Sequence, residues 1–149
     1  EAGLTHGGFY GHFASKDALA AEALTAAFAE SRALVEAATL EGWVKAYLSR
    51  SHRDHPESGC PIPALAADVA QGAEAVRRAF AEGLAMLTGA VAARLDHLGE
   101  AERAARATAL VALMVGGLGL ARTLVAIDRE RSDRLLADLR AEAKSLISP

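Results

Sequence analysis

The apolar residues of this chain recur at the three- and four-residue spacing of α-helices, and helix-breaking residues are few. Hydrophobic residues make up 52% of the sequence but aromatic residues only 5%, so the interior has to be built mainly from Ala, Leu and Val. Ala and Leu are strong helix formers, whereas the β-branched and aromatic residues typical of strands are sparse. With four prolines in 149 residues, the sequence predicts an all-α fold.

Helical spacing and capping residues divide the chain into a series of predicted helices. The longest apolar run, residues 109–121, has thirteen residues, which is too short to cross a bilayer and indicates a buried helix. Residues 52–63 are rich in helix breakers and are expected to form a loop. The predicted helices cover residues 5–13, 16–38, 40–51, 63–71, 73–98, 100–125 and 128–147.

Charge and cysteine content exclude some classes of protein. A formal net charge of −3 argues against a chain coated with basic residues, but it allows a small local surface that reads DNA. The single cysteine, Cys60, excludes a framework of intramolecular disulfides and fits a reducing compartment. No signal peptide is visible, so a soluble cytoplasmic protein without membrane association is expected.

The first seventeen residues have the pattern of the second half of a helix-turn-helix. Gly3 fits a tight turn between two helices, and Thr5 is a suitable N-cap for a short helix after it. In that helix His6 and Tyr10 lie four residues apart and are expected to point outward. Ser15 is a suitable cap for the next helix.

Three short runs in this segment resemble the DNA-reading end of the tetracycline-repressor (TetR) family of transcription factors. The runs are Gly3-Leu4-Thr5, Phe9-Tyr10-x-His12-Phe13 and Ser15-Lys16-Asp17-x-Leu19. The resemblance is close over residues 2–19, and elsewhere it extends only to the order of the helices. It implies that His6, Gly7 and Tyr10 lie nearest the bases, and that Thr5, Gly8, His12 and Lys16 lie nearest the DNA backbone. It also implies that the first part of the helix-turn-helix precedes Glu1.

Lys16 fits the role of a phosphate-binding residue on physical grounds. A cation in the first turn of a helix is unfavourable against the helix dipole unless an anion binds there. Gly8 and Gly11 depart from the family, in which larger residues are common at these positions. Together with Gly7 they place three glycines in one short helix, each about 1 kcal/mol less favourable than Ala. The helix is therefore expected to be loose without DNA; the alternative for the whole segment is a plain helical hairpin.

The resemblance further implies a homodimer whose last two helices pair with those of the partner in a four-helix bundle. The sequence supports this, because small residues such as Gly119 lie among large apolar ones and let helices approach closely. Close packing within a monomer is the alternative. Arg122 is expected to pair with an acid across the interface. The predicted interface residues are Gly116, Gly117, Leu120, Leu135, Leu139 and Leu146.

The middle helices of the family surround a ligand pocket, and aromatic and Met side chains suit an adaptable apolar pocket. The candidate pocket residues are Trp43, Tyr47, His52, Phe80, Met86 and Met114. Each of them equally suits a plain hydrophobic core. A ligand would be mostly apolar, with His52 and Tyr47 as its polar anchors.

A cluster of His and Cys residues, His52, His55 and Cys60, suggests two further hypotheses. The cluster lacks the second ligand pair of a typical zinc site, so neither a metal nor another cofactor is expected. Cys60 is a possible sensor thiol, because neighbouring His and Arg side chains can lower a thiol pKa. The alternative is a buried structural cysteine at the start of a helix.

These observations predict a TetR-like one-component regulator, a repressor that binds palindromic operator DNA as a homodimer and responds to a mostly apolar small molecule. Residues 1–38 are expected to hold the end of the helix-turn-helix and a connecting helix, and residues 39–149 the ligand-binding and dimerisation domain. The alternative is a helical ligand-binding or dimeric interaction protein without DNA binding. No catalytic constellation can be assembled, so an enzyme is not expected.

Overall fold

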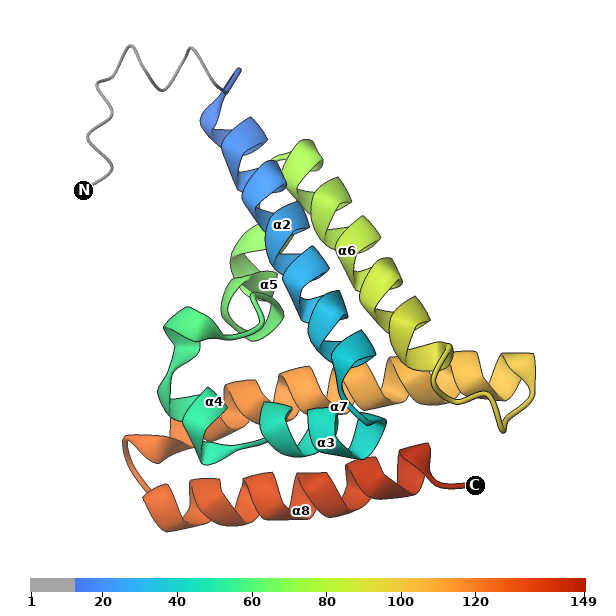
Figure 1. Cartoon of the computed structure of the whole chain (residues 1–149). Coiled ribbons are helices and arrows are strands. Elements are labelled where there is room, and N and C mark those ends of the chain that lie inside the picture. The colour runs from blue at the N-terminus through green and yellow to red at the C-terminus, as the bar shows by residue number, and fades with distance from the viewer. Residues whose placement is uncertain (1–12) are drawn as a thin grey trace.

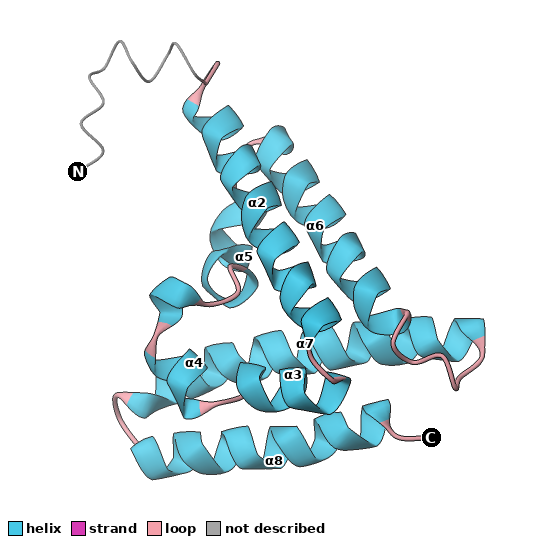
Figure 2. Ribbon diagram, viewed as in Figure 1, coloured by secondary structure: helices cyan, strands magenta, loops and turns pink. Residues whose placement is uncertain are grey.

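The computed structural model describes residues 13–149, and the regular structure in this range is entirely helical (Figure 2). This confirms the prediction of an all-α fold. The described helices are α2 (Lys16–Ala37), α3 (Leu40–Tyr47), α4 (Arg50–Asp54), the 3-10 helix η1 (Pro56–Ser58), α5 (Ile62–Ala70), α6 (Glu74–Ala92), α7 (Glu100–Val125) and α8 (Arg129–Ile147).

Two pairs of helices that cross each other make up the body of the fold (Figure 1). α2 runs beside α6, and α7 runs beside α8, with α3 packed against α8. α6 also contacts α7 and so joins the two pairs. The core lies where the pairs meet, and its fully buried members include Phe28, Leu87, Leu110, Met114 and Leu118.

A glycine and two aromatic rings explain the close approach of α2 and α6. The ring of Phe28 on α2 lies against the backbone of Gly83 on α6, where a Cβ atom would overlap it. Phe80, one turn earlier on α6, meets Phe28 edge to face with ring centroids 5.6 Å apart. Gly83 lowers helix propensity by about 1 kcal/mol, and burial of the Phe28 ring more than offsets this.

Gly117 has the same role between α7 and α8. A Cβ atom at Gly117 would overlap the side chain of Leu139, whereas Gly116 and Gly119 have open space at that position. Gly117 and Leu139, both predicted at a dimer interface, therefore contact each other within one chain. Of the three glycines, Gly117 alone is required for packing inside the described part of the chain.

Helix α7 is long and apolar enough to cross a membrane by length and composition, with a mean hydropathy of 1.8 over eighteen residues. In this fold it is a core helix that packs against both α6 and α8. Its buried side chains include Ala107, Leu110, Met114, Leu118 and Ala121. The predicted helix around residues 109–121 is confirmed, but only one side of it is buried, and Ala109, Ala112, Gly116 and Leu120 are exposed.

Side-chain caps define where several helices begin. The predicted cap at Ser15 is confirmed, because its hydroxyl accepts a hydrogen bond from the Ala18 amide at 3.0 Å. Thr39, Ser49 and Asp128 cap α3, α4 and α8 in the same way.

The predicted helix over residues 40–51 is wrong, because the chain forms two helices there. α3 ends at Tyr47, and Leu48 leaves helical geometry with φ −87° and ψ 39°. Ser49 then caps α4, its hydroxyl accepting from the His52 amide at 3.0 Å. Residues 52–54, predicted as part of a loop, consequently belong to a helix.

The predicted helix over residues 73–98 ends earlier, at Ala92. Beyond it Arg94 reaches the C-terminal end of α2, where the last carbonyl groups of a helix lack partners within the helix. Its guanidinium donates to the carbonyl oxygens of Val35, Glu36 and Ala38 at 3.2, 3.2 and 2.9 Å. The chain thus leaves α6 in a turn that fastens the end of α2.

Candidate ligand-binding site

A cavity of about 500 Å³ is lined by α2, by the α3–α4 pair, and by Gly59 and Cys60, which lie between η1 and α5. Figure 1 shows how these segments are arranged in the fold. This volume falls within the usual range of small-molecule pockets. The lining residues are Ala27, Glu30, Ser31, Leu34 and Ala38 on α2, Gly42, Trp43, Ala46 and Tyr47 on α3, then Ser49, Ser51, His52, Gly59 and Cys60, with Leu87 from α6.

Three of the six residues predicted for a pocket line this cavity. They are Trp43, Tyr47 and His52. The other three lie outside its walls, in the core or packed against it: Phe80, Met86 and Met114. Cys60, the predicted sensor thiol, also lines the cavity and is buried.

The α2 wall of the cavity was missed by the sequence reasoning. Its residues recur at three- and four-residue spacing and therefore share one face of the helix. Two of them break the expected pattern of burial, since the polar Ser31 is buried while the apolar Leu34 is 64% exposed. An apolar residue left open beside a buried polar one is the signal that could have identified this wall.

Aromatic rings form one corner of the cavity. The rings of Trp43 and Tyr47 have centroids 5.7 Å apart, and the Tyr47 ring meets the His52 imidazole edge to face at 4.6 Å. The Tyr47 hydroxyl is buried and has no hydrogen-bond partner. Burial, together with the neighbouring Cys60 side chain, raises the pKa of Tyr47 well above its ordinary value. Tyr47 is therefore a neutral phenol.

His52 joins the end of α3 to the segment that carries Cys60. Its Nδ1 lies 2.7 Å from the carbonyl oxygen of Tyr47, and its Nε2 accepts from the Cys60 amide at 3.2 Å. These two partners require a neutral ring with its proton on Nδ1. Burial lowers the pKa of His52, the bond to the Tyr47 carbonyl opposes this, and the charge of Arg122 adds to the lowering. Gly59 fits here because a Cβ atom would overlap the ring.

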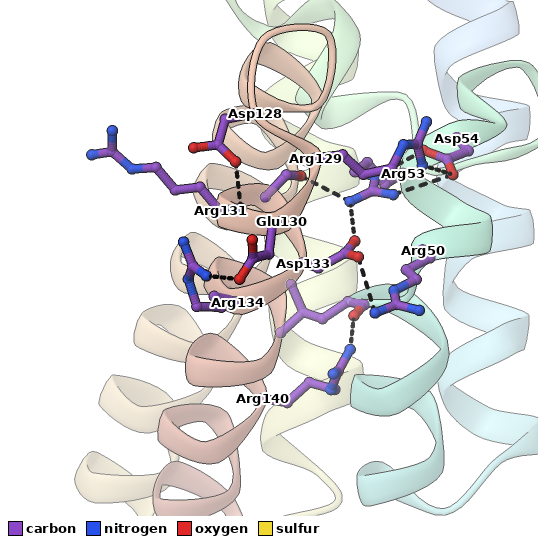
Figure 3. A network of polar contacts seen from close by, with 12 residues as sticks. Arg50, Arg53, Asp54, Asp128, Arg129, Glu130, Arg131, Asp133, Arg134 and Arg140 are labelled. Atoms are coloured by element: carbon purple, nitrogen blue, oxygen red, sulfur yellow. Dashed lines mark hydrogen bonds and ion pairs between the residues drawn. The ribbon is translucent and has the colours of Figure 1, made fainter.

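Arg53, the next residue along α4, points away from the cavity into a polar cluster with α8 (Figure 3). Its side chain is fully buried. The guanidinium donates to Ser132 Oγ at 2.9 Å, to Asp133 Oδ1 at 2.7 Å and to Asp54 Oδ1 at 2.8 Å. The Ser132 hydroxyl in turn donates to the carbonyl oxygen of Ala121 on α7 at 2.8 Å. One side chain therefore ties α4 to both helices of the α7–α8 pair.

The carboxylates of this cluster are held ionised by the arginines around them. Hydrogen bonds from Arg53 lower the pKa of Asp54 to about 2, with a further contribution from Arg129. Hydrogen bonding to Arg53 also lowers the pKa of Asp133, and the charge of Arg50 adds to the effect. The cluster is therefore fully charged at neutral pH.

Two further arginines fasten the α3–α4 region through its backbone. Arg122 of α7 donates to the carbonyl oxygens of His52 at 2.9 Å and Arg53 at 3.3 Å. Arg140 of α8 donates to the carbonyl oxygen of Leu48 at 2.6 Å. The expectation that Arg122 pairs with an acid across an interface stays a prediction; within the chain its Nε and Nη2 donate to these two carbonyl oxygens.

Of the residues predicted to contact DNA, Lys16 alone falls within the described range. It is exposed and opens α2, directly after the Ser15 cap. The predictions for Thr5, His6, Gly7, Gly8, Tyr10 and His12 lie outside the described residues.

The predicted interface residues differ in burial within the chain: some are exposed, some are partly buried and one is buried. Gly116 and Leu120 are exposed on α7, and Leu120 keeps 60% of its surface accessible. Leu135 and Leu146 of α8 are partly buried against the core, and Gly117 is buried against Leu139. The exposed face of α7 is uncharged along its middle and comprises Thr108, Ala109, Ala112, Gly116, Leu120 and Thr123.

The described residues hold no group of three or more His, Cys, Asp or Glu side chains placed to bind a metal ion. His55 and Glu57 contact each other at 3.2 Å on the surface, and Cys60 lies inside the cavity. The cavity wall combines apolar side chains with a few polar groups, among them Ser31, His52 and Cys60.

Comparison with known proteins gives one match. A family model described as the C-terminal domain of LmrA/YxaF-like transcriptional regulators matches residues 37–128. The matched region contains α3 to α7, and with them most of the cavity wall and the whole of α4. No curated protein and no solved structure matches the chain.

Proposed function

Because the chain belongs to the TetR family of transcriptional regulators, with a C-terminal domain of the LmrA/YxaF-like type, we propose that it is a repressor that leaves its operator when a small molecule fills the cavity. The observation that carries this proposal is the cavity itself. It has about 500 Å³, most of its wall lies in the matched region, and it is lined mainly by apolar side chains. Such a pocket suits an effector rather than a reacting substrate.

The DNA-reading end is proposed to be residues 1–38, and the ligand-binding and dimerisation domain residues 39–149. The family match begins at residue 37, which supports a boundary near the end of α2. Bases are contacted by His6, Gly7 and Tyr10, and the DNA backbone by Thr5, Gly8, His12 and Lys16. A cytoplasmic location and the absence of enzymatic activity complete this proposal.

A second copy of the chain is the proposed occupant of the exposed α7 face. Leu120 and Ile127 are 60% and 88% exposed, and an uncharged face that leaves large side chains open is typical of an interface. The neighbouring face of α8 carries exposed charges in the order Arg131, Arg134, Asp138, Glu142. Two such helices packed antiparallel about a two-fold axis bring basic ends to acidic ends. A dimer of this kind places two DNA-reading helices about 34 Å apart, one turn of the duplex.

The proposed signal passes from the cavity to the dimer through α4. His52 lines the cavity, and Arg53 beside it is hydrogen-bonded to Ser132 and Asp133 of α8. A ligand that displaces His52 moves a five-residue helix whose other face is bound to α8. Coupling between the two sites requires a ligand that binds the two states unequally, commonly by ~1–3 kcal/mol.

Cys60 is a second proposed trigger, since its thiol lines the same cavity. Addition of the sulfur to the β-carbon of an unsaturated carbonyl forms a C–S bond, and the thiol proton ends on the α-carbon. The adduct would occupy the cavity as a ligand does. N-ethylmaleimide is the probe, with Cys60→Ser as the control; unchanged DNA affinity of the alkylated wild type would remove this role.

The repressor function is tested by a gel shift with the protein expressed from its complete open reading frame and the DNA upstream of its gene. Tyr10→Ala is expected to weaken specific binding, whereas Lys16→Ala weakens binding to all sequences and flattens the salt dependence. A protein that shifts no DNA at low salt would support the alternative, a helical ligand-binding or interaction protein without DNA binding.

A further inference from the structure

The formal charge of the cavity wall is negative. Glu30 is the acidic residue among the described residues that line the cavity, and Lys and Arg are missing from that set. His52 contributes no charge, because its Nε2 accepts a hydrogen bond from the Cys60 amide and must be unprotonated. A ligand in this cavity therefore meets one uncompensated carboxylate.

Glu30 has no ion-pair partner among residues 13–149. Arg32, two residues along α2, is paired with Glu36 at 2.7 Å, and Arg94 is used by the carbonyl groups at the end of the helix. Glu30 shares the cavity-facing side of α2 with Ser31 and Leu34. Its carboxylate is available to a ligand at the rim of the cavity.

The surroundings of Glu30 are apolar and aromatic. Leu34, one turn along α2, lines the cavity and is 64% exposed, so an occupant that covers it gains hydrophobic contact. Trp43 contributes an aromatic side chain, which attracts cations through its π-face in addition to its apolar area. An acid beside open apolar surface complements a molecule that is both lipophilic and positively charged.

We propose that the effector is a lipophilic cation, with an apolar body against Leu34 and Trp43 and one protonated amine beside Glu30. This inference rests on the proposed function, in which the cavity is the effector site. Arg122 lies on the side of the cavity away from α2, where it donates to the backbone carbonyl oxygens of His52 and Arg53 and lies next to Gly59. A cationic group is therefore favoured on the α2 side, beside Glu30.

Ligand binding can be followed by the fluorescence of Trp43, because Trp43 is the single tryptophan of the chain and lines the cavity. Three probes with one apolar body differ only in charge: 1-adamantylmethylamine, 1-adamantanemethanol and 1-adamantanecarboxylate. Each is titrated into the full-length protein at pH 7, with Trp43 fluorescence and calorimetry as readouts. The amine is expected to bind roughly five- to tenfold more tightly than the alcohol, and the carboxylate most weakly.

Glu30→Gln is expected to abolish the preference for the amine while leaving the affinity for the alcohol unchanged. Glu22→Gln is the matched control, since Glu22 is an exposed acid on the same helix that does not line the cavity. Equal binding of amine and alcohol by the wild type, or a preference that survives Glu30→Gln, would overturn the inference and leave the cavity as a binding site. Failure of all three probes to bind would contradict both the inference and the cavity as the effector site.

Discussion

Three consecutive residues of α4 face three different surroundings. His52 is part of the cavity wall, Arg53 is buried against α8, and Asp54 lies near the surface between Arg53 and Arg129. Of these the sequence pointed to His52, because a His beside aromatic residues suggests a polar anchor. The sequence suggested Arg53 as a neighbour of the Cys60 thiol, but its guanidinium is bonded to Ser132 and Asp133, some eighty residues away in the chain.

Replacing Arg53 by Ala is expected to destabilise the protein by about 2–4 kcal/mol, because the change leaves buried Ser132 and two carboxylates without their donor. Urea unfolding followed by circular dichroism measures this loss. Arg32→Ala is the control, since it removes an exposed pair with Glu36. Equal effects of the two substitutions would show that the cluster does not stabilise the fold.

His52 predicts a pH dependence of stability. The pKa of His52 in the folded protein is lowered from 6.5. Neutral His52 therefore contributes fully to the free energy of unfolding above pH 6.5, and this contribution is lost as the pH falls below 6.5. The free energy of unfolding should therefore decrease between about pH 7 and pH 5, and His52→Gln should flatten this decrease. His97→Gln, at an exposed position, serves as the control. Identical pH profiles for the wild type and His52→Gln would refute this assignment.

At the scale of elements, most of the described helices were predictable, α5 among them, whereas the separate helix α4 and the early end of α6 were not. Residues 100–125 were predicted with the bounds that α7 has, because a continuous apolar segment between capping signals leaves little choice. α4 is too short to be stable alone, so it exists through the Ser49 cap and the bonds from Arg122 and Arg140. Such support comes from distant residues and leaves no periodic signal in the chain.

The exposed face of α7 allows a sharp test of assembly. Leu120→Glu places a charge on that face, and it is expected to convert a dimer into monomers without unfolding them, because Leu120 is 60% exposed within the chain. Size-exclusion chromatography with light scattering gives the mass. Leu65→Glu, at another exposed leucine on α5, is the control and should stay dimeric. A dimeric Leu120→Glu variant would exclude this face as the interface.

At the scale of the whole molecule, the all-α fold followed from composition, whereas the cavity did not. Trp43 and Tyr47 were identified because aromatic side chains on the middle helices suit an apolar pocket. Phe80 and Met114 have the same chemistry but face the core, and only the crossing of the two helix pairs decides which aromatic or Met side chains line a cavity. Glu30 on α2 was missed for the same reason.

The proposed coupling predicts reciprocity between DNA and effector. If an adamantyl probe weakens operator binding by some factor, saturating operator must weaken binding of that probe by the same factor. A gel shift with and without the probe measures how much the probe weakens operator binding. Titration of the probe with and without operator DNA measures how much the operator weakens probe binding. Unequal factors would mean that the probe acts at more than one site.

Because Arg94 binds the C-terminal end of α2, a tilt of the helix about that end displaces residues in proportion to their distance from it. Arg94 holds the carbonyl end of α2, and Ser31, at the cavity, lies about 8 Å from Glu36 by the rise of a helix. Lys16, at the free end, lies about 30 Å from Glu36. A tilt about the fastened end that moves Ser31 by 1 Å therefore moves Lys16 by nearly 4 Å, which is more than the length of a hydrogen bond. Under the proposed function, a small shift of α2 at the cavity is therefore enough to move Lys16 away from a DNA phosphate.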